Sequence, residues 1–143
     1  MTHEAEFRGE DAMRKIGLFR LFVCSAGAIG SNLTDNLIRI GFKEIGVIDF
    51  DRVEIGNVGT QRYGRKDAGA MKVAALGSRI FSDTGIGIVE HGKKLEASNA
   101  PRLLQGGYDL IVDCFDNHAS RKIVQDYARA KNVAALHVGV SGD

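Results

Sequence analysis

The sequence predicts an α/β protein, a Rossmann-like three-layer domain with a mainly parallel sheet. Apolar strand-like runs alternate with helical patterns along the chain, an order typical of a parallel sheet with helices on both faces. Residues 20–57 give the most specific example. They contain an apolar strand, a glycine turn, a helix, and a second apolar strand that ends in two aspartates. This arrangement is half of a nucleotide-binding βαβ unit.

The first third of the chain shows clear element boundaries. A short amphipathic helix is expected over residues 10–19. Residues 21–24 form a continuous apolar run, which predicts a strand buried on both faces. Leucine and isoleucine at helical spacing predict a helix over residues 31–40, and residues 45–50 form the second strand.

A long polar segment follows the second strand. Residues 52–68 are rich in glycine and polar side chains, so we expect a loop. Its length exceeds that of a routine connection, which indicates function or mobility. The remaining expected elements are helices over residues 72–81, 97–105 and 118–130, and strands over residues 87–90, 109–114 and 134–140.

Composition favours an ordinary cytoplasmic protein. The 143 residues suffice for one domain and not for two of ordinary size, so we expect a single domain over residues 1–143. A net charge of +1 gives no argument for a nucleic acid or a membrane partner. Residues 1–15 are polar and lack the apolar core of a signal peptide. No apolar run approaches the roughly 20 residues that span a bilayer.

The cysteines and histidines show no metal-binding pattern. Cys24 and Cys114 lie in expected core strands without metal-type spacing, so we interpret both as buried structural residues. The histidines form no cluster and are interpreted as surface or strand-end residues; they are His3, His91, His118 and His137.

The glycine turn is the first candidate binding element. Residues 25–30 follow the pattern GxGxxG with serine in the first place. Gly27 would let a phosphate or ribose approach the backbone, and Gly30 would let the helix pack tightly on the strand. The N–H groups at the start of the helix, beginning near Ala28, would favour an anion. A purely structural strand-to-helix turn remains an alternative.

Acidic residues at the end of the second strand are the next candidates. Asp49 lies 19 residues beyond Gly30, where a carboxylate can accept hydrogen bonds from ribose hydroxyls of ATP or of NAD. Asp51 is either a ligand or a loop-capping residue.

Later polar residues favour ATP over a dinucleotide. Lys72 is placed to neutralise phosphate charge, and Asp116, at the end of another strand, can hold Mg²⁺ against phosphate oxygens. Strand ends at one edge of a parallel sheet converge on one crevice, so these residues can share a site with Asp49. Candidates in the preceding loop are Asn57, Gln61 and Arg62.

With these residues in place, the chain resembles the adenylation domain of the ThiF/MoeB/HesA superfamily, to which the ubiquitin-activating enzymes belong. The resemblance spans roughly residues 8–143. Its most specific parts are the spacing from Asp49 to Asn57 and the run Asp-Cys-Phe-Asp-Asn at 113–117, followed by Arg121.

The resemblance implies an ATP- and Mg²⁺-dependent adenylyltransferase. Such an enzyme activates a carboxylate, commonly the C-terminus of a ubiquitin-like or sulfur-carrier protein or of a peptide, as an acyl adenylate with release of pyrophosphate. Carried over, Asp49 would bind the ribose, Lys72 the phosphates and Asp116 Mg²⁺, while Asn57 would order the loop or touch the phosphates. The resemblance also implies a homodimer, with Arg8 as the arginine that reaches the neighbouring subunit's site.

Three departures from the family pattern keep alternatives open. Ser25 replaces a glycine, and Thr60 stands where the family has arginine. Either Arg62 or Arg65 compensates through a rearranged loop, or phosphate binding is weaker. The family's further C-terminal strands and thioester-forming cysteine do not follow Asp143, so we expect a domain truncated relative to the family. The alternatives are a family member that acts on a small molecule or in tRNA modification, a nucleotide-binding module without turnover, and an NAD-dependent Rossmann domain.

Overall fold

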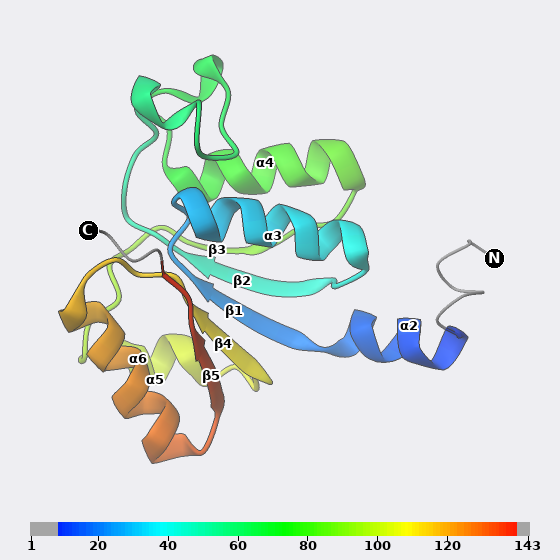
Figure 1. The fold of residues 1–143 in the computed structure, drawn as a ribbon, viewed down its shortest axis with the longest axis vertical. Helices are drawn as coiled ribbons and strands as arrows, with labels where there is room; N and C mark the ends of the chain where they lie inside the picture. Colours follow the sequence, from blue (N-terminus) through cyan, green and yellow to red (C-terminus); the bar gives the residue numbers. More distant parts are fainter. Residues whose placement is uncertain (1–8, 140–143) are drawn as a thin grey trace.

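The computed structural model describes residues 9–139, and in these residues a five-stranded sheet separates two layers of helices (Figure 1). All neighbouring strands are parallel, in the order β3-β2-β1-β4-β5. This confirms the predicted α/β fold class, with a fully parallel sheet. The strands are β1 (Arg20–Cys24), β2 (Glu44–Ile48), β3 (Val89–His91), β4 (Leu110–Asp113) and β5 (Ala134–His137). The helices are α2 (Glu10–Leu18), α3 (Ala28–Ile40), α4 (Lys72–Thr84), α5 (Ala100–Leu104) and α6 (His118–Lys131).

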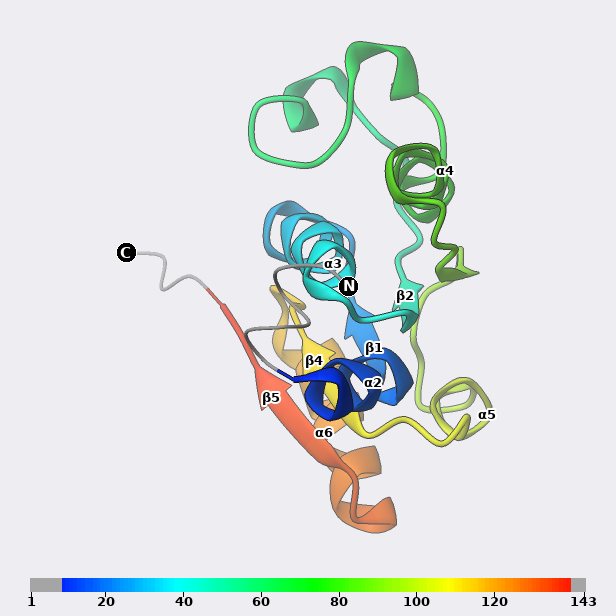
Figure 2. The same cartoon turned by 90° about the vertical axis from the view of Figure 1, so that its right-hand side faces the viewer.

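The central strand β1 shows how the layers form. Its side chains alternate between two hydrophobic clusters, one on each face of the sheet. Leu21 and Val23 join the cluster that α3 and α4 cover, whereas Phe22 and Cys24 join the cluster with α5 and α6. The edge-on view shows the two helical layers on opposite sides of the strands (Figure 2). A strand buried on both faces therefore reads as a continuous apolar run.

Element boundaries differ from the expected ones chiefly beside the glycine turn and at the strand ends. Helix α3 begins at Ala28, earlier than expected, because its first turn lies within the glycine motif. Strand β2 ends at Ile48, so Asp49 lies just beyond the ladder and above the sheet edge. Strand β5 ends at His137, and Val140 lies outside the described residues.

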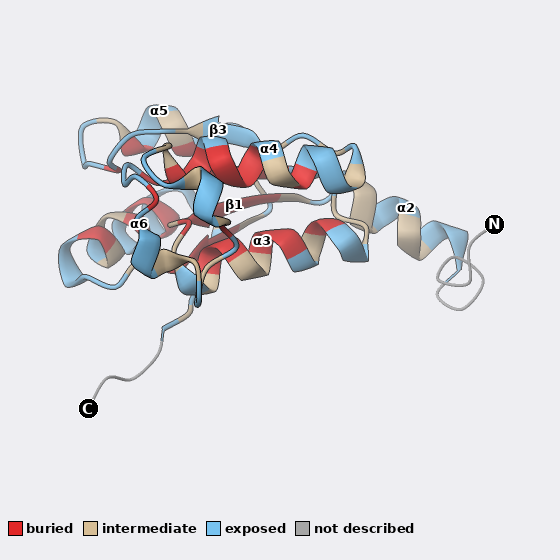
Figure 3. Ribbon diagram, turned by 90° about the horizontal axis from the view of Figure 1, so that it is seen from above, coloured by how far each residue is buried: buried red, intermediate tan, exposed pale blue. Residues whose placement is uncertain are grey.

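The long loop after β2 contains two short 3₁₀ turns, η1 (Ile55–Asn57) and η2 (Arg65–Asp67). Its two ends are joined by a bridge between Arg52 and Met71, which places the start of α4 beside the end of β2. Helix α2 has no buried residue, in contrast to the buried stripes of α3 and α4 (Figure 3). Within residues 9–139, no helix is long and apolar enough to cross a membrane.

Candidate functional site

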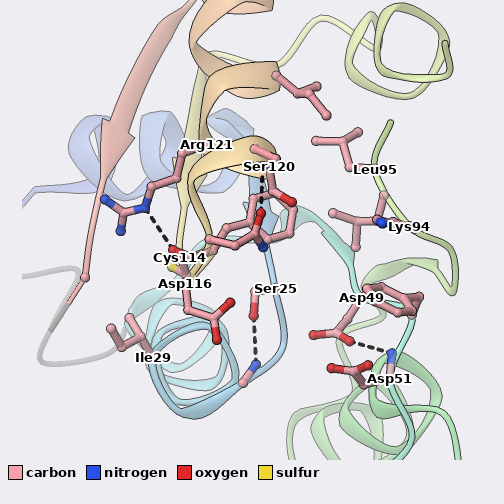
Figure 4. A pocket seen from close by; sticks show the side chains of 18 of the residues that line it. Ser25, Ile29, Asp49, Asp51, Lys94, Leu95, Cys114, Asp116, Ser120 and Arg121 are labelled. Atoms are coloured by element: carbon pink, nitrogen blue, oxygen red, sulfur yellow. Dashed lines mark hydrogen bonds between the residues drawn. The ribbon is translucent and has the colours of Figure 1, made fainter. Parts of the chain in front are cut away.

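A cleft of about 1350 Å³ opens at the carboxyl ends of the strands. The strand order reverses at β1, since β2 and β3 lie to one side of it and β4 and β5 to the other. Open parallel sheets bind ligands at such a reversal. Residues predicted from the sequence line the cleft, namely Gly27, Ala28, Asp49, Asp51, Gln61, Lys72 and Asp116. Figure 4 shows Asp49 and Asp116 among the side chains that surround it.

The two glycines of the turn differ in what surrounds them. A Cβ atom on Gly30 would lie 1.9 Å from the carbonyl oxygen of Ser25, so only glycine allows this contact between helix and strand. Gly30 does not line the cleft. A Cβ on Gly27 would meet only the Ser25 hydroxyl, at an ordinary 3.4 Å. The protein's own packing therefore does not require glycine at Gly27, and the open space beside it is available to a ligand.

Asp49 holds the turn in place through its carboxylate. One oxygen accepts the N–H of Ala26 at 2.7 Å, and the other accepts the N–H of Asp51 at 2.7 Å. The hydroxyl of Tyr63 donates to the carbonyl of Ala26 at 2.6 Å. Burial, with Asp49 and Asp67 adding to it, raises the pKa of Tyr63, which keeps this donor protonated. Asp49 is 7% exposed and lines the cleft, and each of its carboxylate oxygens has capacity for a further hydrogen bond from a ligand.

Lys72 supplies a buried positive charge. It is the first residue of α4, its side chain lines the cleft, and it is 7% exposed. Its backbone N–H donates to the carbonyl of Asp51 at 2.9 Å, which couples the helix to the end of β2. The ion pairs of residues 9–139 do not include Lys72. A buried ammonium group that forms no ion pair within residues 9–139 favours an anionic ligand, because burial of an unpaired charge is costly.

The wall beyond β4 is built around the start of α6. Asn117 caps this helix by accepting the N–H of Ser120 at 2.8 Å. Arg121 donates to the carbonyls of Phe115 and Val138, each at 2.9 Å, and so ties the end of β4 to the end of β5. Figure 4 shows the bond from Arg121 beside Asp116. These contacts fix the backbone on both sides of Asp116.

Asp116 is exposed, and the hydrogen bonds and ion pairs of the described chain leave its carboxylate unengaged. In that same part of the chain, no three His, Cys, Asp or Glu side chains gather in a way that could hold a metal ion. A lone carboxylate suits Mg²⁺, which keeps several waters and binds through one or two carboxylates together with substrate phosphates. The donor set therefore fits a magnesium ion that arrives with a nucleotide.

Like Gly30, the predicted residues Asn57 and Arg62 lie outside the cleft lining. The side chain of Asn57 accepts the N–H of Glu54 at 2.8 Å and closes the η1 turn. Arg62 is exposed, and its Nε lies 3.3 Å from a carboxylate oxygen of Asp35 on α3. This ion pair directs Arg62 toward α3, and only Gln61 of the three loop candidates lines the cleft. The Oε1 atom of Gln61 is buried without a hydrogen-bond partner among the described residues.

The sequence interpretation missed several residues of the site. Asp113 is fully buried, and one of its oxygens lies 2.6 Å from Nδ1 of His137, which lines the cleft. Lys93, Lys94 and Leu95 also line it from the segment after β3. Because this segment follows a strand end, the same convergence argument could have identified it. The pairing of Asp113 with His137 gives no local signal, since 24 residues separate them.

Cys114 lines the cleft as well. Burial, reinforced by the Asp113 carboxylate and opposed by Arg121, raises the pKa of this thiol to about 11. A thiol with this pKa is protonated at neutral pH and is a poor nucleophile. This agrees with the structural role expected from the sequence.

Comparison with known proteins gives a consistent result. A model of the ThiF family matches residues 2–142. SUMO-activating enzyme subunit 2 of Dictyostelium discoideum is 27% identical over 143 residues, which are 99% of this chain and 22% of that protein. The sulfur carrier protein adenylyltransferase of Thermus thermophilus is 30% identical over 122 residues, 84% of this chain and 45% of that protein. The chain thus spans less than half the length of these relatives.

A solved structure shares the fold. The crystal structure of E. coli tRNA N6-threonylcarbamoyladenosine dehydratase in complex with ATP matches with a TM-score of 0.91 at 23% identity. The match covers 97% of this chain and 58% of that chain. The three-layer arrangement described above is therefore the arrangement of an experimentally determined protein.

Proposed function

Because the chain belongs to the ThiF family, we propose that it forms the nucleotide-binding domain of an adenylyltransferase. The carboxylate of a substrate attacks the α-phosphate of ATP, which gives an acyl adenylate and releases pyrophosphate. Relatives named as a modifier-activating enzyme subunit and as a sulfur carrier adenylyltransferase support a protein or peptide C-terminus as the substrate. Since the chain covers only part of those relatives, this activity is proposed for the whole protein.

The observation that carries this proposal is the buried Lys72 in the cleft. Its charge lies in the same cleft as the open glycine turn at Gly27 and the Asp116 carboxylate. A triphosphate with Mg²⁺ satisfies all three at once. A ribose beside Asp49 would complete the nucleotide, with the helix N-terminus at Ala28 facing its phosphates.

The proposed reaction requires the protein mainly to position the reactants and to stabilise charge. The substrate carboxylate is already ionised at neutral pH, so no general base is needed to make it a nucleophile. Positive charge from Lys72 would stabilise the charge that develops on the phosphates. Asp116 would hold Mg²⁺, which would neutralise phosphate oxygens when bound. The remaining contribution is alignment of the carboxylate with the α-phosphate.

Calorimetric titration tests nucleotide choice directly. We expect wild type to bind ATP with a requirement for Mg²⁺, and Lys72→Ala to bind at least tenfold more weakly because one buried charge contact is lost. Lys131→Ala is the matched control, since Lys131 is exposed at the end of α6 and outside the cleft. Binding of NAD⁺ in preference to ATP would contradict the proposal and leave a dinucleotide domain.

A second candidate is a module that binds ATP without turnover. Two features favour it. Thr60 stands at the position where the family has an arginine, and the nearby Arg62 is turned toward α3 by its ion pair with Asp35. Exchange of labelled pyrophosphate into ATP, measured with the full-length protein and candidate C-terminal peptides, separates the two. An adenylating enzyme exchanges with its own substrate, whereas the module binds ATP and exchanges with none.

We further propose a homodimer, to be measured by light scattering of the purified chain. Helix α2 supports this proposal, because none of its residues is buried within the described part of the chain. Arg8, the candidate for reaching a neighbouring site, lies outside the described residues.

A further inference from the structure

The backbone of Ser25 has an unusual conformation. Its φ angle is +86°, in the left-handed region that favours glycine. Among residues 9–139, the other non-glycine residue with positive φ is Asn132, at the C-terminal end of α6, where asparagine is common. Serine carries a steric cost at such a position that glycine does not. The residue at position 25 is therefore not the one that the backbone prefers.

Neighbouring groups hold this conformation from several directions. The N–H of Ser25 donates to the carbonyl of Ile48 at 2.8 Å, and the next N–H, that of Ala26, is held by Asp49. The carbonyl of Ser25 packs against Gly30, where even a Cβ atom would not fit. These contacts hold the turn in the conformation that strains Ser25. This explains how the strain is maintained, but not why the side chain is there.

The hydroxyl is the only group that serine adds beyond the Cβ of alanine, and it lines the cleft. Its oxygen accepts the N–H of Gly27 at 3.2 Å, drawn as a dashed line in Figure 4. Its own proton has no acceptor among the hydrogen bonds of the described residues. A hydroxyl can donate one bond while it accepts others. The free proton is thus available to a ligand in the cleft.

We propose that Ser25 is a nucleotide-contacting residue, whose hydroxyl donates a hydrogen bond to a phosphate oxygen of ATP. This inference rests on the proposed function and assigns a contact that a glycine at this position could not make. An anionic acceptor is the ligand group that this place favours, because Lys72 and the open face of Gly27 line the same cleft. The contact would add to phosphate binding at a site from which Arg62, in the loop after β2, is held away by Asp35.

Two variants separate the effect of the Ser25 hydroxyl on ATP binding from the effect of backbone strain on stability. Ser25→Ala keeps the Cβ and removes the hydroxyl, whereas Ser25→Gly removes both. Ser78→Ala is the control, since Ser78 is exposed on α4 and does not line the cleft. Each protein is titrated calorimetrically with ATP plus Mg²⁺, with AMP and with adenosine, and its melting temperature is recorded.

We expect both variants to bind ATP about tenfold more weakly than wild type, the size of one hydrogen bond to a charged group. Adenosine, which has no phosphate, should bind all proteins equally. Ser25→Gly should melt roughly 2–4 °C higher than Ser25→Ala, because glycine relieves the strain. Higher stability combined with weaker ATP binding is a result that a purely structural hydroxyl would not give.

Three results would overturn the inference in distinguishable ways. If wild type binds ATP and both variants bind it equally well, Ser25 makes no contact, while the proposed function stands. If the variants lose affinity for adenosine as much as for ATP, the hydroxyl acts through the shape of the turn. If wild type itself binds none of the three ligands, the proposed nucleotide site fails, and this contact fails with it.

Discussion

Two buried aspartates stand at comparable places in the sheet, Asp49 just after β2 and Asp113 at the end of β4, but they bind different partners. In each, one carboxylate oxygen accepts a hydrogen bond from the backbone N–H of the residue two positions further along, at 2.7 Å for Asp49 and 2.9 Å for Asp113. The second oxygen of Asp49 accepts another backbone N–H, that of Ala26. The second oxygen of Asp113 binds the imidazole of His137.

This difference gives the two sides of the cleft different properties. A backbone N–H can only donate, so the contacts of Asp49 allow a single arrangement and make the floor of the cleft rigid. An ionised carboxylate only accepts hydrogen bonds, so Nδ1 of His137 is the donor to Asp113; this partner is a side chain, which can rotate or change tautomer when Asp113 is replaced. The side of the cleft at Asp49 is thus held by contacts to the backbone, whereas the side toward β5 is held by a contact between two side chains.

The largest expected effect comes from the turn that Asp49 holds. Gly30→Ala should destabilise the fold by about 3 kcal/mol, because its Cβ would overlap the Ser25 carbonyl and the backbone of the turn would have to shift. Chemical denaturation followed by circular dichroism measures this. Gly56→Ala is the control, since nothing lies within 4 Å of a Cβ there. A loss below 1 kcal/mol for Gly30→Ala would show that the turn is not rigid.

A smaller effect on the free energy of unfolding is expected from replacing either aspartate by asparagine, and the two replacements should differ. Asp49→Asn should cost about 2 kcal/mol, because its amide group would face either the N–H of Ala26 or that of Asp51. Asp113→Asn should cost less than about 1 kcal/mol, since His137 can change tautomer and accept from the new amide. Denaturant melts at pH 7.5 give both values.

Removing the imidazole sharpens this comparison. In a His137→Ala background neither the carboxylate nor the new amide has an imidazole partner, so the cost of Asp113→Asn should change from its value in the wild-type background. Equal costs for the two asparagine variants in the wild-type background would contradict the distinction between a side held by the backbone and a side held by side chains.

The smallest expected effect concerns His91, whose carbonyl accepts the N–H of Asp49. Burial, with a contribution from Lys93, lowers the pKa of His91 below its ordinary value of about 6.5. The folded state therefore binds a proton less readily than the unfolded state. Stability should fall as the pH drops below about 6.5, and His91→Leu should reduce this slope. Melts at pH 7.5 and 5.5 measure it, with the exposed His118→Gln as the control.

The sequence predicted the fold and the location of the cleft because both depend on regular patterns. Strands buried on both faces are continuous apolar runs, and parallel strand ends must meet at one edge. This argument placed Asp49, Lys72 and Asp116 in one cleft, where the structure has them. Their roles in binding stay predictions until a ligand is measured.

Side-chain partners could not be predicted in the same way. Arg62 lies next to Gln61 in sequence, yet an ion pair with Asp35 on α3 turns it from the cleft. The bond from Tyr63 to Ala26 spans 37 residues, and the strained φ of Ser25 depends on contacts with Ile48 and Gly30. Such features follow from tertiary packing, for which local spacing gives no signal.

The central claim is that ATP binds at the carboxyl edge of this sheet. The most direct measurement is a titration of ¹⁵N-labelled protein with ATP and Mg²⁺, followed through the backbone amide signals. We expect large shifts for residues 25–30, 49–51 and 114–121, with little change in α2 or in the C-terminal turn of α6. Shifts confined to other surfaces, or unchanged spectra at millimolar ATP, would contradict this claim.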